Sequence, residues 1–160
     1  MDETKVDLHA LYARLDGDSL KAAASAAARA GDDDEAAFWL GALNLWAQAR
    51  DKKAQWRQVA EREIGLIKDK LVEALSPVKV YLFGSFADGR AREDSDFDFY
   101  VVVRDDVGRR MIDLTVDANR AIHPVQTRPA DIIVGTESGF RDGNGVICLE
   151  VKEKGVLLYG

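Results

Sequence analysis

"VYLFGSFADGRAREDSDFDFYVVV", residues Val80–Val103, decides the fold, because two apolar runs enclose a Gly-Ser turn and a densely charged patch. The runs are short and rich in β-branched and aromatic residues, which predicts two β-strands, "VKVYLF" and "FDFYVVV". The intervening "GSFADGRA" has room for a short helix. The stretch therefore combines a glycine turn after one strand with two carboxylates at the next.

The turn at Gly84-Ser85 is typical of backbone that holds phosphate. A glycine between strand and helix allows a positive φ and a close approach to a ligand, while the helix start offers free N–H groups. Ser85 adds a hydroxyl donor, and Arg90 or Arg92 adds charge. Such turns are also common as simple connections. A Walker A loop is excluded, because Arg90 and Ala91 stand where Lys and Ser/Thr are required.

The two aspartates Asp96 and Asp98 are expected on one side of the second strand, with Phe97 and Phe99 on the other, because strand side chains alternate. Two carboxylates held close together repel each other unless a cation joins them. Hard oxygen ligands that combine with substrate phosphate suit Mg²⁺. The spacing therefore predicts a magnesium site.

Two other interpretations of the acidic segment compete with a magnesium site. A helix-loop-helix calcium site is excluded, because Phe99 and Asp105 stand where its sixth-position Gly and twelfth-position Glu are required. An acidic turn, in which Asp94 to Asp98 only cap and solubilise, stays open. It does not explain Asp98, which lies inside an apolar run where a carboxylate is costly without a partner.

A third acid, Asp131, begins the strand-like run "ADIIV". Alone it has an equally good explanation as a strand-start residue near Pro129. Together with Asp96 and Asp98 it makes a set of three carboxylates on neighbouring strands, which can hold two metal ions. In that interpretation one ion escorts the nucleotide phosphates and the other lowers the pKa of an attacking hydroxyl.

Residues 1–75 contain no proline and carry apolar residues at helical spacing, which predicts helices. Breaks are expected at Asp16–Asp18, with Asp18 as a cap, and at Gly31–Asp34, with Gly31 ending a helix. The predicted helices are the Ala-rich "SLKAAASAAARA", then "EAAFWLGALNLWAQAR", and then a separate helix from about Ala54 to Leu75, which implies a further break near residues 51–53. Two apolar stripes are expected in cores, the second against a sheet: Trp39, Leu43 and Trp46, then Trp56, Ala60, Ile64, Ile67, Leu71 and Leu75.

The second half of the chain predicts a mixed α/β fold. "GRRMIDLTVDANRAI" has helical spacing, with Met111, Leu114 or Thr115, Ala118 and Ile122 facing inward, and "SGFRDGNG" is loop-like. "VICLEVKEKGVLLYG" predicts a helix and a last strand, Val156–Tyr159. The expected domains are an N-terminal helical segment, 1–50, and an α/β domain, 51–160, which places the whole chain in the α/β (α+β) class.

Composition narrows the partners and the compartment. The chain has 160 residues, 47% of them hydrophobic, with a net charge of −6, so an extended nucleic acid is not its expected partner. Residues 1–50 hold nine acidic and five basic residues, which favours a protein-docking face. The single Cys148 is expected in the core and cannot form an internal disulfide. With no signal pattern and no membrane-length apolar run, the expected location is cytoplasmic.

Gly84-Ser85, ten residues, and then Asp96-x-Asp98 match the G-S-x10-D-x-D signature of the minimal nucleotidyltransferases (MNT type) in the DNA polymerase beta superfamily. The chain resembles this family from about Ala54 to Gly160, where "ADIIV" looks like its third-acid segment and "EKGVLLYG" like its usual ending. The resemblance implies a small mixed sheet with packed helices. It also implies an enzyme that transfers a nucleoside monophosphate, usually from ATP, to a hydroxyl and releases pyrophosphate.

The resemblance also assigns roles to particular residues. Gly84 and Ser85 would bind the triphosphate of ATP or another NTP, and Ser95 would orient its neighbouring aspartate. Asp96 and Asp98 would hold Mg²⁺, and Asp131 would hold a second ion or activate the acceptor. Arg90 or Arg92 would steady the phosphates, and the choice between them stays open.

Many enzymes of this type are antitoxins that adenylylate a HEPN-type helical ribonuclease, which makes such a protein the expected partner. The N-terminal helices are not an active HEPN nuclease, because the pattern of Arg, four to six residues and His is absent. His9 has no preceding Arg, and the nearest Arg before His123 is Arg120. Both histidines are expected to be ordinary surface or core residues.

Two alternative functions stay open from the sequence. One is a small-molecule nucleotidyltransferase of the aminoglycoside type. Such enzymes usually have an additional helical domain after the catalytic one, whereas this chain ends about thirty residues beyond Asp131. The other is a non-catalytic nucleotide-binding or docking module, which has no need to keep three acids on strands. The acceptor, the nucleotide preference and the oligomeric state, a homo-oligomer included, are left open.

Overall fold

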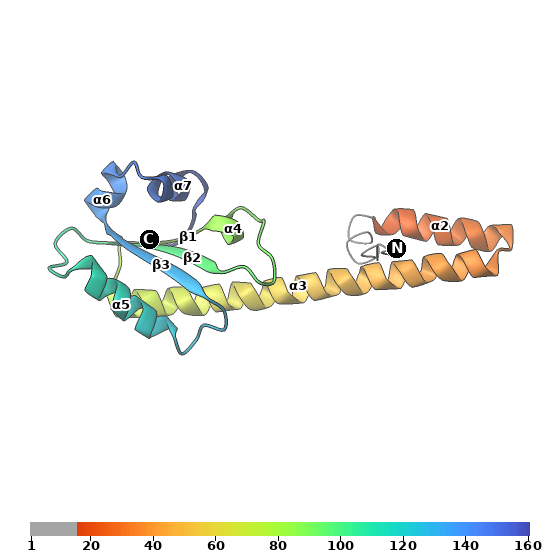
Figure 1. The fold of residues 1–160 in the computed structure, drawn as a ribbon, viewed down its shortest axis with the longest axis horizontal. Helices are drawn as coiled ribbons and strands as arrows, with labels where there is room; N and C mark the ends of the chain where they lie inside the picture. Colours follow the sequence, from red (N-terminus) through yellow and green to blue (C-terminus); the bar gives the residue numbers. More distant parts are fainter. Residues whose placement is uncertain (1–15) are drawn as a thin grey trace, which may run out of the picture. The chain divides into compact units, whose positions relative to one another are not determined.

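The structure is a computed structural model that describes residues 16–160 (Figure 1), so the prediction for His9 lies outside the described residues. Ten helices and strands follow one another within that range, and they confirm the predicted mixed α/β class. They are α2 (Gly17–Ala30), α3 (Asp33–Leu75), β1 (Lys79–Phe83), α4 (Gly84–Ala87), β2 (Phe97–Val103), α5 (Met111–Ile122), β3 (Ala130–Thr136), α6 (Glu137–Asp142), α7 (Val146–Lys154) and β4 (Val156–Tyr159).

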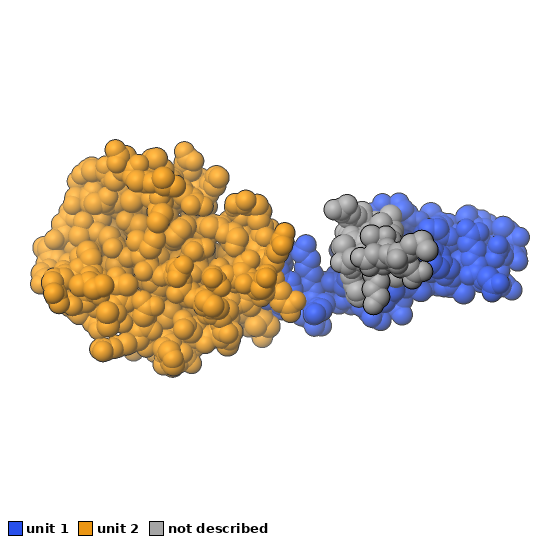
Figure 2. All heavy atoms as spheres, in the orientation of Figure 1, with its two compact units in different colours: residues 1–58 blue, residues 59–160 orange. Residues whose placement is uncertain are grey.

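The chain divides into two compact units, residues 1–58 and residues 59–160, which Figure 2 colours separately. Within residues 16–160, the first unit contains α2 and the beginning of α3, and the second contains the end of α3 and all four strands. The predicted domain boundary at residue 50 stays a prediction, because a division by contacts does not establish which part folds alone.

Helix α2 begins and ends with its own capping residues. Asp16 is the N-cap, and its carboxylate accepts hydrogen bonds from the Ser19 backbone N–H at 2.8 Å and the Ser19 hydroxyl at 2.7 Å. Asp18, the expected cap, lies in the first turn instead, because Asp16 is the residue three before the donor N–H. Gly31 closes the helix at φ 75°, as predicted.

The core of the first unit is small and aromatic. Leu20 and Ala42 are buried, with Trp39, Leu43 and Trp46 packed against them, which confirms the predicted packing role of this stripe. A Cβ placed on Gly17 would lie 2.4 Å from the Trp46 ring. Glycine at the start of α2 therefore lets the indole lie directly on the backbone.

Helix α3 runs without interruption through the segment where two helices were predicted. The prediction of a break near residues 51–53 was wrong because "RDKKAQ" contains neither Gly nor Pro and consists mostly of good helix formers. Despite the length of α3, no helix in residues 16–160 is both long and apolar enough to cross a membrane.

Helix α6 occupies part of the segment predicted to be a loop. Thr136 caps it, because its hydroxyl accepts a hydrogen bond from the Gly139 N–H at 3.1 Å. The carboxylate of Asp105 accepts from the Ser138 N–H at 2.9 Å and satisfies a second free donor of the first turn. The glycines of "SGFRDGNG" predicted a loop, but these two caps stabilise a short helix.

The four strands form one mixed sheet in the order β3-β2-β1-β4. β1 pairs antiparallel with β2 and with β4, while β2 and β3 are parallel and are connected through α5. The predicted strands "FDFYVVV" and Val156–Tyr159 have the expected bounds. β3 and β4 are the two edge strands.

Helices cover both faces of the sheet in the second unit (Figure 1). The C-terminal part of α3 and α5 lie on one face, where the predicted inward residues Ile67, Leu71, Leu114, Ala118 and Ile122 are buried. α6 and α7 lie on the other face, where the buried residues are Phe83, Tyr100, Val102 and Val151, with Cys148 and Phe140 packed against them. Because side chains alternate along β2, Asp98 belongs to the α7 face and Phe97 to the α3 face.

Candidate active site

One row of the sheet carries the central residues of the predicted site. Asp98 pairs with Phe83 on β1 and with Asp131 on β3. Residues directly opposite each other on paired strands point to the same face, and neighbouring strands lie about 4.8 Å apart. The register therefore places the Asp98 and Asp131 carboxylates side by side, immediately next to the end of β1 where the Gly-Ser turn begins.

Gly84 lies so close to Asp98 that any side chain at this position would displace the carboxylate. Its φ is 67°, in the left-handed region, and a Cβ added there would lie 2.3 Å from Asp98 Oδ2. α4 is only a single turn, so the dipole of this helix contributes little. A phosphate at this turn would be held by backbone N–H groups and the Ser85 hydroxyl, directly beside the carboxylate.

The electrostatics around Asp98 join three further acids to it. Burial raises the pKa of the Asp98 carboxyl, and the negative charges of Asp131, Asp96 and Glu150 raise it further, in that order. A carboxylate in such surroundings is stabilised by a bound cation. The charge partners include both other predicted metal ligands, which agrees with a shared site.

Asp96 lies one residue before β2, so its predicted alignment with Asp98 on one side of the strand stays a prediction. It is exposed and follows a tight turn. In this turn the Ser95 hydroxyl accepts a hydrogen bond from the Arg92 N–H at 2.9 Å, and the Ser95 N–H donates to the Arg92 carbonyl at 3.1 Å. Ser95 thus shapes the backbone that leads to Asp96, and its predicted role toward the aspartate stays a prediction.

The two candidate arginines have different surroundings. The Arg90 side chain donates to Asp88, with Nε 2.7 Å from Oδ2, and this ion pair lowers the pKa of the Asp88 carboxyl. The Arg92 side chain is exposed, and its backbone N–H makes the bond to Ser95. The Asp88 carboxylate raises the pKa of the Arg90 guanidinium, and the negative charge of Glu150, which also acts on Asp98, adds to that rise.

Glu150 is a site neighbour that the sequence did not reveal. It lies on α7, one residue before the buried Val151, and its charge acts on Asp98 across the sheet face. The helix itself was predicted, but its placement over β1 and α4 is a tertiary contact that no local pattern encodes. The only sequence signal for Glu150 is that it precedes Val151, an apolar residue of the predicted helix, and this does not indicate a neighbour of Asp98.

The donor set fits a hard divalent cation. Asp98 and Asp131 supply carboxylate oxygens from neighbouring strands, and Gly84 leaves the space beside Asp98 free of a side chain. Within residues 16–160, no three acidic, imidazole or thiol groups lie together as a finished metal centre. An ion bound there would be held by few protein ligands and by substrate phosphate, as Mg²⁺ usually is.

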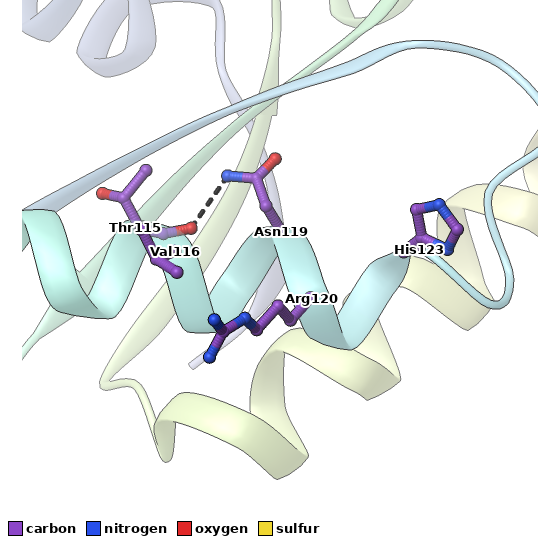
Figure 3. Close-up of a pocket in the computed structure, with 5 residues that line it drawn as sticks. All are labelled: Thr115, Val116, Asn119, Arg120 and His123. Atoms are coloured by element: carbon purple, nitrogen blue, oxygen red, sulfur yellow. Dashed lines mark hydrogen bonds between the residues drawn. The ribbon is translucent and has the colours of Figure 1, made fainter.

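A separate cavity of about 640 Å³ lies along α5 (Figure 3). It is lined by Thr115, Val116, Asn119, Arg120 and His123, and the Asn119 amide donates to the Thr115 carbonyl at 2.8 Å. No predicted catalytic or metal-binding residue lines it. His123 is exposed at the C-terminal end of α5, in agreement with an ordinary surface role.

Three solved structures are similar to part of this chain. The crystal structure of a toxin–antitoxin with AMP-PNP is 24% identical, with a TM-score of 0.39, over 59% of this chain and 71% of that one. A Sulfolobus solfataricus protein described as a nucleotidyltransferase is 23% identical, with a TM-score of 0.38, over 61% and 83%. A mutant of the toxin–antitoxin MntA-HpeT is 22% identical, with a TM-score of 0.37, over 61% and 72%.

Among curated proteins none matches the sequence. The family model described as "Polymerase beta, Nucleotidyltransferase" matches residues 66–160, more than half of the chain. That range contains every predicted site residue, from Gly84 to Asp131. The chain therefore belongs to the polymerase beta nucleotidyltransferase family, as its resemblance to that superfamily predicted.

Proposed function

We propose that the protein is a Mg²⁺-dependent enzyme that transfers AMP from ATP to a hydroxyl group and releases pyrophosphate. The observation that carries the proposal is the register row that pairs Asp98 with Asp131 beside the Gly84 turn. This row brings the proposed phosphate-binding turn next to the proposed metal-binding carboxylates, where β1 ends and β2 begins.

Each residue of the site has a proposed role. Gly84 and Ser85 hold the triphosphate through backbone N–H groups and a hydroxyl, and Arg90 or Arg92 steadies its negative charge. Asp96 and Asp98 are the ligands for Mg²⁺, and Asp131 either holds a second ion or takes the proton of the acceptor hydroxyl. Bound Mg²⁺ would neutralise phosphate charge and make that hydroxyl more acidic.

The chemical step requires little covalent work from the protein. The acceptor oxygen forms a bond to the α-phosphorus, the bond from that phosphorus to the bridging oxygen breaks, and pyrophosphate leaves. The hydroxyl proton passes to Asp131, which is exposed and accessible, or to water. Positioning and charge neutralisation supply the catalysis.

The proposed acceptor is a hydroxyl on a protein partner of the HEPN type. This choice rests on the resemblance to the minimal nucleotidyltransferases. The acidic composition of the N-terminal segment supports it as a docking face for a protein. The proposed location is the cytoplasm, where ATP and Mg²⁺ are supplied together.

The test is incubation of the purified protein with α-labelled ATP and Mg²⁺, alone and with helical proteins encoded by neighbouring genes. Label is expected on one partner protein, and Asp96→Ala with Asp98→Ala is expected to abolish it. Asp94→Ala is the matched control, because Asp94 is exposed in the same acidic segment and should leave transfer unchanged. Nucleotide binding without transfer to any acceptor would instead identify a non-catalytic module.

A further inference from the structure

Glu63 is a buried carboxylate that lies outside the candidate site. It belongs to α3 and is 4% exposed. Its Oε1 accepts hydrogen bonds from the backbone N–H groups of Thr127 and Arg128, the latter at 3.2 Å, and its Oε2 accepts from the Thr127 hydroxyl at 2.8 Å. One side chain of α3 thereby fastens the segment that leads into β3.

Arg128 extends this anchoring from Glu63 to two other segments. Its Nε lies 3.5 Å from Glu63 Oε2, and its guanidinium carbon lies 5.0 Å from the Phe97 ring centre and 5.7 Å from that of Phe86. Its Nη1 donates to the Glu93 carbonyl at 3.4 Å. The side chain is 15% exposed, so these contacts are made largely away from water.

The three segments joined in this way each carry part of the candidate site. Phe86 directly follows Ser85, and its ring lies 4.6 Å from that of Phe97, which separates Asp96 from Asp98. The Phe97 N–H donates to the Pro129 carbonyl at 3.0 Å, two residues before Asp131. Because Phe97 and Asp98 point to opposite faces of β2, the contacts support the carboxylates from behind.

Stability alone gives little reason for this arrangement. Replacing a buried ion pair with apolar residues of similar size is often neutral or stabilising, because two charges must be taken out of water. Arg128 Nε is also a buried nitrogen without a hydrogen-bond acceptor among the described residues. The directional contacts of the pair fix the distances between three chain segments. Apolar contacts are less directional and would let those distances vary.

We propose that Glu63 and Arg128 form a positioning pair that sets the spacing between the phosphate turn, the Asp96-Asp98 segment and Asp131. The inference rests on the proposed function, since the spacing matters for joint binding of nucleotide and metal. Neither residue is among the predicted phosphate-binding or metal-binding residues. Direct partners of metal ligands commonly change metal affinity or activity by about 10-fold to 100-fold when they are altered. Glu63 and Arg128 contact neighbours of the predicted ligands, so the lower end of that range is expected.

The test uses the full chain with Arg128→Lys and, separately, Glu63→Gln. Arg128→Lys keeps the charge but loses the planar donor group, and Glu63→Gln keeps the shape but loses the charge. Mg²⁺-dependent binding of AMP-PNP is measured by calorimetry together with the Mg²⁺ concentration for half-maximal binding. Both variants are expected to need about tenfold more Mg²⁺.

The control separates positioning from general destabilisation. Ile122 is fully buried on α5, and its side chain takes no part in the bonds made by Glu63 and Arg128. Of Ile122→Val and Ile122→Ala, the variant whose melting temperature is closer to that of Arg128→Lys serves as the control. It is expected to keep the Mg²⁺ dependence of the wild type. Should Arg128→Lys fail to fold, Thr127→Val removes only the hydroxyl bond to Glu63 and is expected to raise the Mg²⁺ requirement in the same direction.

The outcomes distinguish the two proposals. If the wild type binds AMP-PNP with Mg²⁺ and the folded variants match the Ile122 control, the positioning role is overturned while the proposed function stands. If the wild type does not bind AMP-PNP in a Mg²⁺-dependent way, or if Asp98→Asn does not abolish that binding, the proposed function is overturned, and the positioning role with it. A larger Mg²⁺ requirement in the variants but not in the control supports the pair.

Discussion

Gly84 is the residue at which backbone conformation and site chemistry meet. Its φ of 67° and the 2.3 Å that would separate an added Cβ from Asp98 Oδ2 impose two separate demands on one position. The first concerns strain in the backbone and the second concerns the placement of a carboxylate. Gly89 has a similar φ of 78° with open space around it, so the chain contains its own control.

Gly84→Ala is expected to lower transfer about 100-fold, because displacing Asp98 by about an ångström disturbs the reacting geometry. Gly89→Ala imposes the same kind of backbone strain, about 1 kcal/mol, without bringing a Cβ near any of the three predicted metal-binding acids. The measurement is the initial rate of label transfer at saturating ATP. Equal losses in the two variants would contradict a specific role for the Gly84–Asp98 contact.

Asp98 is expected to reduce the stability of the metal-free protein at neutral pH. Its raised pKa means that the ionised form is less favourable in the folded state than in the unfolded state. This penalty is present above the folded pKa and disappears as the pH falls toward the unfolded value of about 3.9. Protonation of Asp98 on acidification should therefore raise the free energy of unfolding.

Asp98→Asn is accordingly expected to raise the melting temperature of the metal-free protein at pH 7 while it abolishes transfer. The gain should shrink as the pH is lowered through the raised pKa of Asp98. Thermal unfolding followed by circular dichroism at several pH values measures both effects. Asp94→Asn, at an exposed position, is the comparison, and a lower melting temperature for Asp98→Asn than for Asp94→Asn would refute the prediction.

At the scale of elements, α3 is the clearest difference between expectation and structure. Apolar spacing identified both stripes of the helix, but a break was predicted where the sequence has no residue that stops a helix. The position of Glu63 was also missed. It borders the stripe formed by Ala60, Ile64 and Ile67, and its burial depends on the Thr127 segment that packs there.

Ala54→Pro tests whether α3 is continuous. Position 54 is exposed in the helix interior, where proline removes a backbone hydrogen bond and costs about 3 kcal/mol. Loss of helical signal and a lower melting temperature are expected, with Ala54→Ser, a far milder change, as control. If proline is tolerated as well as serine, a second helix begins near residue 54 and the chain has the predicted break.

The strands show what local pattern can and cannot predict. "FDFYVVV" and the final strand were readable because their apolar, β-branched composition is local. The pairing of Asp98 with Asp131 was not, since strand order and register depend on contacts between distant segments. The same reason hides Glu150 and Arg128, whose partners lie on other elements.

At the scale of the whole molecule, the boundary between the helical segment and the catalytic domain is open to direct measurement. The family model begins at residue 66, within α3, and so omits Ala60, Glu63 and Ile64. All three are buried in the second unit. A functional domain should therefore require residues before the start of the family match.

The fragment 51–160 is expected to unfold cooperatively and to bind AMP-PNP with Mg²⁺ as the full chain does. The fragment 66–160 is expected to be less stable and to bind more weakly, because it lacks Glu63 and its bonds to Thr127. Thermal melts and calorimetry on both fragments provide the comparison. Failure of fragment 51–160 to fold would refute the predicted domain boundary.

The place of β3 at the border of the sheet affects which acceptors can be reached. Asp131 is exposed on this outermost strand and does not lie at the bottom of an enclosed hollow. An acceptor hydroxyl can approach it from the open side whether it belongs to a small molecule or to a folded macromolecule. Selection of the correct acceptor must then depend on surfaces beyond the reacting groups, and those surfaces can change in evolution without disturbing the carboxylates.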